Sequence, residues 1–280
     1  MPAPLYALGA IASVQVGATV ARHLFAFVGA TGTVFLRVAF GACILLAIAR
    51  PRWPRFDARQ WRAIVLFGLI IAGMNLCFYQ AIARIPLGVA VTIEFIGPLS
   101  VAIVSSRKAL DFAWAAMAAA GVALLSFSGG AVTALGLLFA LGAAAGWASY
   151  IVLSQRVGRL VPGPDGLAFA LAVGGLALLP FGIAGAGNRL LNLPNLALGL
   201  IVAILSSAIP FSLEFAALRR LSRQAFGILM SLEPAMGAAA GFLFLGQRLS
   251  LRDLIAIGLV MVASAGATRT APPPAATDVP

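Results

Sequence analysis

Residues 87–105 read LGVAVTIEFIGPLSVAIVS, an apolar run whose one acidic residue, Glu94, stands four positions before Pro98. A helix that crosses a membrane needs about 20 mostly apolar residues. A carboxylate in hydrocarbon costs roughly 2.5 kcal/mol or more. Proline lacks the N–H that would bond the carbonyl four residues earlier, so Pro98 frees the carbonyl of Glu94. A charged side chain and an unpaired carbonyl at the same depth in the membrane indicate a functional site within this helix.

Two more glutamates repeat this arrangement. Glu214 lies four residues after Pro210, and Glu233 directly precedes Pro234. Pro210 frees the carbonyl of Ser206 in the same way. The whole chain of 280 residues holds only eight acidic residues. Three of them therefore lie in apolar sequence beside a proline, which favours function over scaffold.

The composition predicts an all-α integral membrane protein. Hydrophobic residues make up 62% of the chain and charged residues 10%, against about 45–50% and 25% in soluble domains. The net charge of +11 comes from basic residues that lie mostly in short gaps between apolar runs. This placement is typical of loops that face anionic lipid, so the lipid bilayer is an expected partner and nucleic acid is not.

Apolar runs between polar breaks predict ten transmembrane helices. The first break is expected at Arg22 and His23, and Ala271–Pro280 is rich in proline and expected to be disordered. The predicted spans are 5–21, 29–49, 63–83, 87–105, 112–128, 133–154, 166–187, 195–217, 224–246 and 252–268.

Basic residues predict the orientation. With both termini in the cytoplasm, thirteen of the nineteen Arg and Lys residues fall in inside loops and five in outside loops. Cytoplasmic loops carry the excess of Lys and Arg, so this orientation is favoured. Arg37 is the remaining basic residue and lies inside a span.

The two halves of the chain resemble each other. Residues 79–85 match residues 215–221 at an offset of 136, and the same offset carries Pro98 onto Pro234. Five spans per repeat is an odd number, so the second copy would be inverted, as in many transporters. We expect repeats at 1–128 and 133–268 and a disordered cytoplasmic tail at 269–280. Faces of small residues in the sixth and ninth spans would pack helices together or form a homodimer.

The candidate site collects polar residues of the apolar spans. Arg37 could bind a substrate carboxylate bidentately, or it could pair with Glu94. Glu214 lies near a basic cluster at 219–223 and could instead be interfacial. The candidates for substrate or proton binding are Glu94, Glu233, Glu214, Arg37, Asn75, Tyr79, Gln15 and Tyr150, and the expected helix breaks are at Pro98, Pro210 and Pro234.

Other functional classes find little support. His23 is the only histidine, and Cys43 and Cys77 lie in apolar runs, so no metal site, cofactor or catalytic constellation is expected. Asp253 is interpreted as a helix N-terminal residue in a capping box with Ser250. A membrane enzyme, a signalling or accessory subunit and a channel are the alternatives, and the inverted halves disfavour the channel.

Several quoted runs carry a resemblance to a known family. Residues 73–79 (GMNLCFY), 86–90 (PLGVA), 94–99 (EFIGPL), 210–214 (PFSLE) and 231–234 (SLEP) resemble the EamA branch of the drug/metabolite transporter superfamily. The resemblance covers nearly the whole chain and is strongest to bacterial exporters of small amino acids. It implies a ten-helix exporter of threonine-like or homoserine-like amino acids in the bacterial inner membrane, driven by protons. An exporter of other metabolites or of drugs is the alternative within the family.

One departure from the family pattern is visible. Family members often have glutamate after the glycine that ends the ninth span, whereas this chain has Gln247 after Gly246. We expect the change to remove an exposed charge and a loop contact. It does not touch the three buried glutamates, one of which would alternately bind a proton and the substrate amine.

Overall fold

The protein is a bundle of helices, and no β-strand occurs in the described part of the chain. The computed structural model describes residues 3–51, 56–104, 109–126, 132–161, 164–218, 220–221 and 223–270. The expected disordered segment Ala271–Pro280 lies outside these residues, as do Arg52, Arg55, Arg107, Lys108 and Arg219 of the predicted inside loops. The elements are α1 (Ala3–Ala49), α2 (Ala58–Ile82), α3 (Leu87–Glu94), α4 (Ile96–Val104), α5 (Ala109–Ser126), α6 (Ala134–Leu160), α7 (Asp165–Ala186), η1 (Gly187–Leu191), α8 (Leu193–Ala203), η2 (Ile204–Ala208), α9 (Ile209–Leu218), α10 (Arg223–Met230), α11 (Glu233–Leu245) and α12 (Leu251–Thr270).

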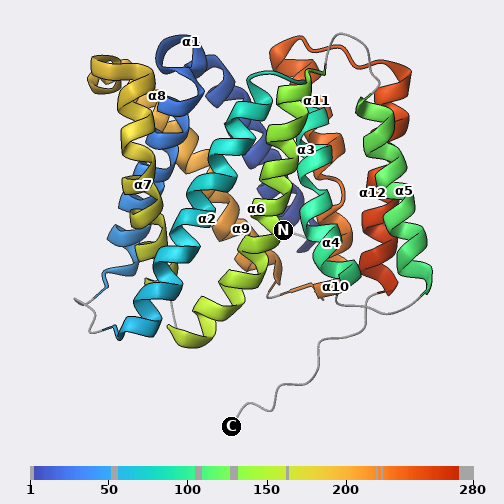
Figure 1. Cartoon of the computed structure of the whole chain (residues 1–280), viewed down its shortest axis with the longest axis horizontal. Coiled ribbons are helices and arrows are strands. Elements are labelled where there is room, and N and C mark those ends of the chain that lie inside the picture. Colours follow the sequence, from blue (N-terminus) through green and yellow to red (C-terminus); the bar gives the residue numbers. More distant parts are fainter. Residues whose placement is uncertain are drawn as a thin grey trace.

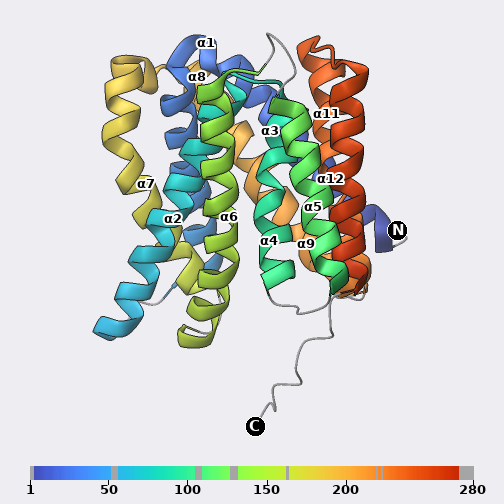
Figure 2. The same cartoon turned by 45° about the vertical axis from the view of Figure 1, so that its right-hand side comes forward.

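Many of these helices are long and apolar enough to cross a membrane. Seven such helical stretches occur among the described residues, and 87–101 and 112–125 form two shorter apolar helices. Figure 1 shows α7 and α8 at one side of the bundle and α5 and α12 at the other, with α3, α4 and α6 between them. Figure 2 shows the same order from a second direction. The fold is that of an integral membrane protein.

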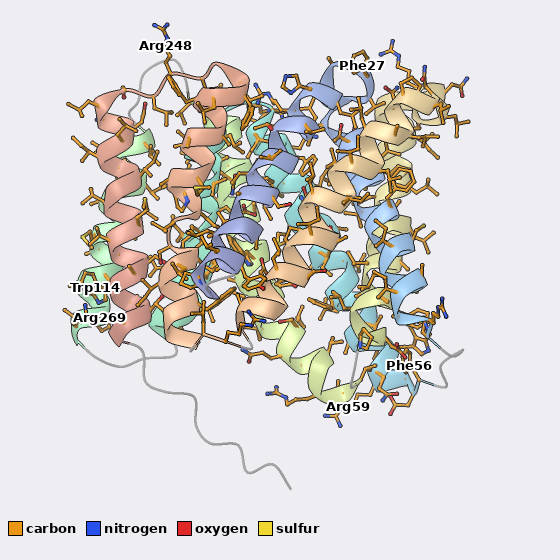
Figure 3. All side chains as sticks on the ribbon, turned by 180° about the vertical axis from the view of Figure 1, so that it is seen from behind. Phe27, Phe56, Arg59, Trp114, Arg248 and Arg269 are labelled. Atoms are coloured by element: carbon orange, nitrogen blue, oxygen red, sulfur yellow. The ribbon has the colours of Figure 1, made fainter. Side chains whose placement is uncertain are left out.

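The first predicted break is in the wrong place. Residues Arg22 and His23 lie inside α1, where the His23 ring is hydrogen-bonded to the Thr19 carbonyl one turn earlier. The chain turns instead at Gly29, with φ 69° and ψ 174°. Glycine adopts such positive φ values readily because it has no Cβ. Figure 3 places Phe27, beside this turn, at one edge of the bundle, and α1 therefore consists of two arms.

The opposite edges of the bundle differ in their residues. Figure 3 shows Phe27 and Arg248 at one edge and Phe56, Arg59 and Arg269 at the other. We call these the Arg248 edge and the Arg59 edge. The helix α2 begins at the Arg59 edge and is 25 residues long, about 38 Å at 1.5 Å per residue, so it ends at the Arg248 edge.

Helix ends are capped as the local sequence dictates. The predicted capping box of α12 is confirmed: the Asp253 carboxylate accepts from the Ser250 N–H at 2.8 Å, and the Asp253 N–H donates to Ser250 Oγ at 3.2 Å. At α2, Asp57 and Gln60 form a second capping box. The Gln60 amide also donates to the Leu160 carbonyl at 2.8 Å, which ties α2 to the end of α6.

Small residues bring the central helices close together. A Cβ placed on Gly88 of α3 would lie 2.6 Å from the Ala238 Cα of α11, and one placed on Gly146 of α6 would lie 2.8 Å from the Met74 Cβ of α2. Such distances are below normal contact, so glycine is required at both crossings. This packing holds α3 and α11 side by side, and these are the helices that carry Glu94 and Glu233.

Candidate functional site

A cavity of about 250 Å³ lies among the central helices. Both arms of α1 line it, together with α2, α3, α6, α7, η2, α9, α10 and α11. Seven of the eight candidate binding residues are on its wall: Glu94, Glu214, Glu233, Arg37, Asn75, Gln15 and Tyr150. Residues up to 219 positions apart in the sequence thus meet at one place, as Val14 and Glu233 do.

Helix interruptions surround this cavity, and each lies just before one of the three prolines. The helix α3 ends at Glu94 and α4 begins at Ile96, two residues before Pro98. The helix α10 ends at Met230 and α11 begins at Glu233, next to Pro234. These interruptions place freed helix ends, and the glutamates beside them, at the cavity.

The third proline, Pro210, follows a π-helical segment, η2. The Ser206 carbonyl, which has lost its helical partner to Pro210, accepts a long hydrogen bond of 3.4 Å from Arg37 Nη2. Ser13 Oγ donates to the neighbouring Leu205 carbonyl at 2.7 Å. Side chains of α1 therefore satisfy the carbonyls of the broken helix, and this contact fixes the Arg37 guanidinium at the cavity wall.

The three glutamates share the cavity without a protein partner. Glu233 is 7% exposed, and Glu94 and Glu214 are half-buried. Among the described residues, no hydrogen bond or ion pair holds any of their carboxyl groups, and the Arg37–Glu94 ion pair is not formed. Buried carboxyl groups are costly unless paired, so their partners are expected to come from outside the protein.

Uncharged polar side chains complete the wall. Gln15 is 3% exposed, and its Oε1 has no hydrogen-bond partner within the described structure. The Asn75 amide donates to the Ile71 carbonyl at 2.8 Å and keeps its oxygen for other partners. Aromatic rings of Trp147 and Tyr150 in α6 form one side of the cavity. The wall therefore combines acceptors, one fixed cation and apolar surface.

Tyr79 lies behind the wall. It is fully buried, and the Arg37 guanidinium carbon lies 5.4 Å from the centre of its ring. Its other neighbours include Phe25, with ring centres 5.8 Å apart. Tyr79 therefore contacts Arg37 without lining the cavity itself, whereas we expected it to line the site directly.

Several wall residues were not among the predicted ones, and Met230 is the most informative. It ends α10 as Glu94 ends α3, and the offset of 136 that relates the halves carries Glu94 onto Met230. The same offset carries Ile71 onto Ser207, and both line the cavity. Because Glu94 was a predicted site residue, the repeat offset was a signal in the sequence that would have found Met230.

The Gln247 departure has a different structural consequence from the one expected. The half-buried Gln247 side chain accepts from the Leu87 N–H at 2.9 Å, at the first turn of α3. Pro86, which precedes that turn, gives it no side-chain cap. Gln247 thus keeps the loop contact that we expected the change to remove, and it links the end of α11 to the start of α3.

A bundle of apolar helices around a central cavity with buried carboxyl groups is a feature of membrane transporters. The sequence profile of the EamA-like transporter family matches residues 1–128 and again residues 134–269. The chain therefore belongs to the EamA-like transporter family.

Relatives are found along nearly the whole chain. The threonine/homoserine exporter RhtA of Escherichia coli is 44% identical over 266 residues, which cover 94% of this chain and 90% of the relative. The protein of the same name from Salmonella typhimurium is 42% identical and covers 95% of this chain and 91% of its own. Protein PecM of Dickeya dadantii is 31% identical over 73% of this chain and 72% of its own.

A solved crystal structure has the same fold. It matches with a TM-score of 0.62 over 96% of this chain and 97% of that chain, at 21% sequence identity. At this identity the likeness shows the fold alone.

Proposed function

We propose that the protein exports small amino acids of the threonine and homoserine type across the bacterial inner membrane in exchange for protons. The observation that carries the proposal is the cavity, where three unpaired carboxyl groups and one guanidinium share about 250 Å³. Pockets for drug-sized ligands measure about 300–1,000 Å³, so this volume favours a smaller ligand. The relatives named threonine/homoserine exporters agree with this choice.

The wall offers a partner for each group of such a substrate. An ammonium group would bind the carboxylates of Glu94 or Glu233, and a carboxylate would bind the guanidinium of Arg37. The free Oε1 of Gln15 would accept the side-chain hydroxyl of threonine or homoserine. All of these groups line the same cavity, as binding of one molecule to all of them requires.

Proton coupling follows from competition for the same carboxylate. A buried carboxyl group without a partner favours its neutral, protonated form. On the inner side the glutamate would release its proton and bind the substrate ammonium. On the outer side it would take up a proton and release the ammonium. One amino acid would leave for each proton that enters through a given carboxylate, and charge in the cavity would stay balanced.

We further propose ten membrane crossings in two inverted repeats, 1–128 and 133–268, with both termini in the cytoplasm. The two arms of α1 would supply two crossings. The interrupted pairs α3–α4, α8–α9 and α10–α11 would supply one crossing each. The excess of arginine in the predicted inside loops supports this orientation, since Arg59 and Arg269 lie at the same edge.

A second candidate is export of apolar metabolites or drugs. Phe78, Trp147, Met74 and Met230 make one part of the wall apolar, and methionine adapts to ligands of varied shape. Counterflow in proteoliposomes separates the two candidates. Threonine and homoserine would exchange under the first proposal, and a lipophilic cation would exchange in their place under the second.

Export in cells tests the proposal directly. Cells that overproduce the protein should tolerate toxic homoserine concentrations and accumulate homoserine and threonine in the medium. An Arg37→Gln variant should lose this effect, because it removes the only cation that the described residues place on the cavity wall. The exposed Arg189 lies outside the cavity, so Arg189→Gln is the matched control. If the wild-type protein exports neither amino acid, the substrate proposal is wrong.

A further inference from the structure

A second pocket, of about 550 Å³, lies near the Arg248 edge of the bundle. It is formed by α1 around its turn and by the end of α2, which reaches that edge (Figure 3). Its polar lining consists of Arg22, Thr31, Gln80 and Arg84. No acidic residue of the described chain lines it, so two guanidinium groups face a pocket without a carboxylate from these residues.

The two arginines are placed differently. Arg22 Nη1 is enclosed and has no hydrogen-bond partner among the described residues. A buried donor without a partner costs free energy, and more so when it is charged. Arg84 is held in place, because its Nη1 donates to the Gln80 carbonyl at 2.7 Å and its guanidinium lies over the Phe139 ring at 5.1 Å. One guanidinium is thus fixed and the other lacks an acceptor, which an anion would supply.

Two aromatic side chains, Phe25 and Tyr79, link this pocket to the central cavity. Phe25 lines the pocket, and its ring centre lies 5.8 Å from that of Tyr79. Tyr79 also contacts Arg37, which lines the central cavity and whose guanidinium carbon lies 5.4 Å from the Tyr79 ring centre. A continuous line of contacts therefore runs from Arg37 in the central cavity through Tyr79 to Phe25. Phe25 in turn lines the pocket that holds Arg22 and Arg84.

We propose that the Arg22–Arg84 pocket is a second binding site for the substrate carboxylate, occupied after the amino acid leaves Arg37 and before its release. The inference rests on the proposed function and extends it to the exit path. Tyr79 and Phe25 form the partition that must move to let the substrate pass. Guanidinium groups bind carboxylates by paired, charge-assisted hydrogen bonds, which suits a ligand that has just left another arginine.

The experiment measures the affinity for substrate on each side of the membrane. Proteoliposomes with a known protein orientation are loaded with homoserine, and exchange is followed while the concentration is varied outside or inside. Arg22→Gln and Arg84→Gln should raise the KM for homoserine on the side of the Arg248 edge about tenfold, as expected for a lost charged hydrogen bond. The KM on the opposite side should not change.

Arg248→Gln is the matched control, since it removes an exposed positive charge from the same edge and does not line the pocket. It should leave both KM values unchanged. Arg22→Lys, which keeps the charge, should recover part of the affinity lost in Arg22→Gln. Competition by threonine amide, which lacks the carboxylate, should be equal in wild type and variants.

Different failures have different meanings. If the wild-type protein exchanges homoserine and both glutamine variants keep its KM on the Arg248 side, the second site does not exist. An equal rise on both sides, or a drop in melting temperature that accounts for the loss, would also overturn it in favour of a structural role. If the variants differ from the wild type only in how homoserine exchange depends on anionic phospholipid, the arginines bind lipid phosphate and the proposed substrate site is wrong. If the wild type carries no homoserine, the proposed function fails first.

Discussion

Replacing Gly88 by alanine should push α3 away from α11. The added Cβ would lie 2.6 Å from the Ala238 Cα, whereas ordinary contact begins at 3.4 Å, so the helices must separate by the difference of 0.8 Å. The clash is with backbone, which cannot rotate away as a side chain can. Overpacking of this kind costs about 1–3 kcal/mol. At about 2–4 °C per kcal/mol, the melting temperature of the purified protein should fall by several degrees.

The same separation should lower export, because α3 and α11 carry Glu94 and Glu233 to the cavity. Gly73→Ala in α2 is the matched control, since a Cβ there meets nothing within 4 Å. That substitution should leave export unchanged and stabilise the helix by up to about 1 kcal/mol. A Gly88→Ala protein with the melting temperature of the wild type and the wild-type rate of homoserine export would refute the close contact between these helices.

Three further substitutions should change transport or stability in a direction that the structure predicts. Pro210→Ala should restore the helical partner of the Ser206 carbonyl, release Arg37 and slow homoserine exchange without lowering the melting temperature; faster exchange would contradict this. Gln247→Ala removes the acceptor of the Leu87 N–H and should cost about 1 kcal/mol, measured by thermal melting, whereas Gln247→Glu should keep the bond. Tyr79→Phe removes a buried hydroxyl that has no hydrogen-bond partner among the described residues, so stability should hold or rise by about 1 kcal/mol; a loss of substrate affinity would show that the hydroxyl binds substrate after all.

Hydrophobicity predicted much of the fold, because a span in lipid must be apolar and must satisfy its own backbone. The predicted run 252–268 matches α12 within two residues at each end, and the run 63–83 matches the end of α2 within one residue but misses its first five. The turn in α1 was missed for a physical reason. A polar residue such as His23 can stay exposed within a continuous helix, so polarity alone does not mark a break. Gly29 marks it through its backbone conformation, which hydropathy does not report.

The site was predictable where chemistry and chain geometry coincide. A glutamate beside a proline reports both a costly charge and a freed carbonyl, and the cavity contains all three such glutamates. The position of Tyr79 was not predictable, because the face that an aromatic residue presents depends on helix rotation within the bundle. Met230 is an ordinary apolar residue, and nothing in its own chemistry indicates a site. It can be predicted only from the offset of 136 that carries Glu94 onto it.

The most direct measurement is homoserine transport driven by an imposed pH gradient in proteoliposomes, compared among the wild type, Glu94→Gln, Glu233→Gln and the control Asp165→Asn. Asp165 lies in the first turn of α7 and does not line the cavity. If the cavity carboxylates exchange a proton for the substrate amine, at least one glutamine variant should lose about 90% or more of gradient-driven transport, in line with the loss of a charged contact. The control should transport like the wild type. Glu94→Gln and Glu233→Gln proteins that both move homoserine against its gradient at the wild-type rate would contradict proton–amine exchange at these carboxylates.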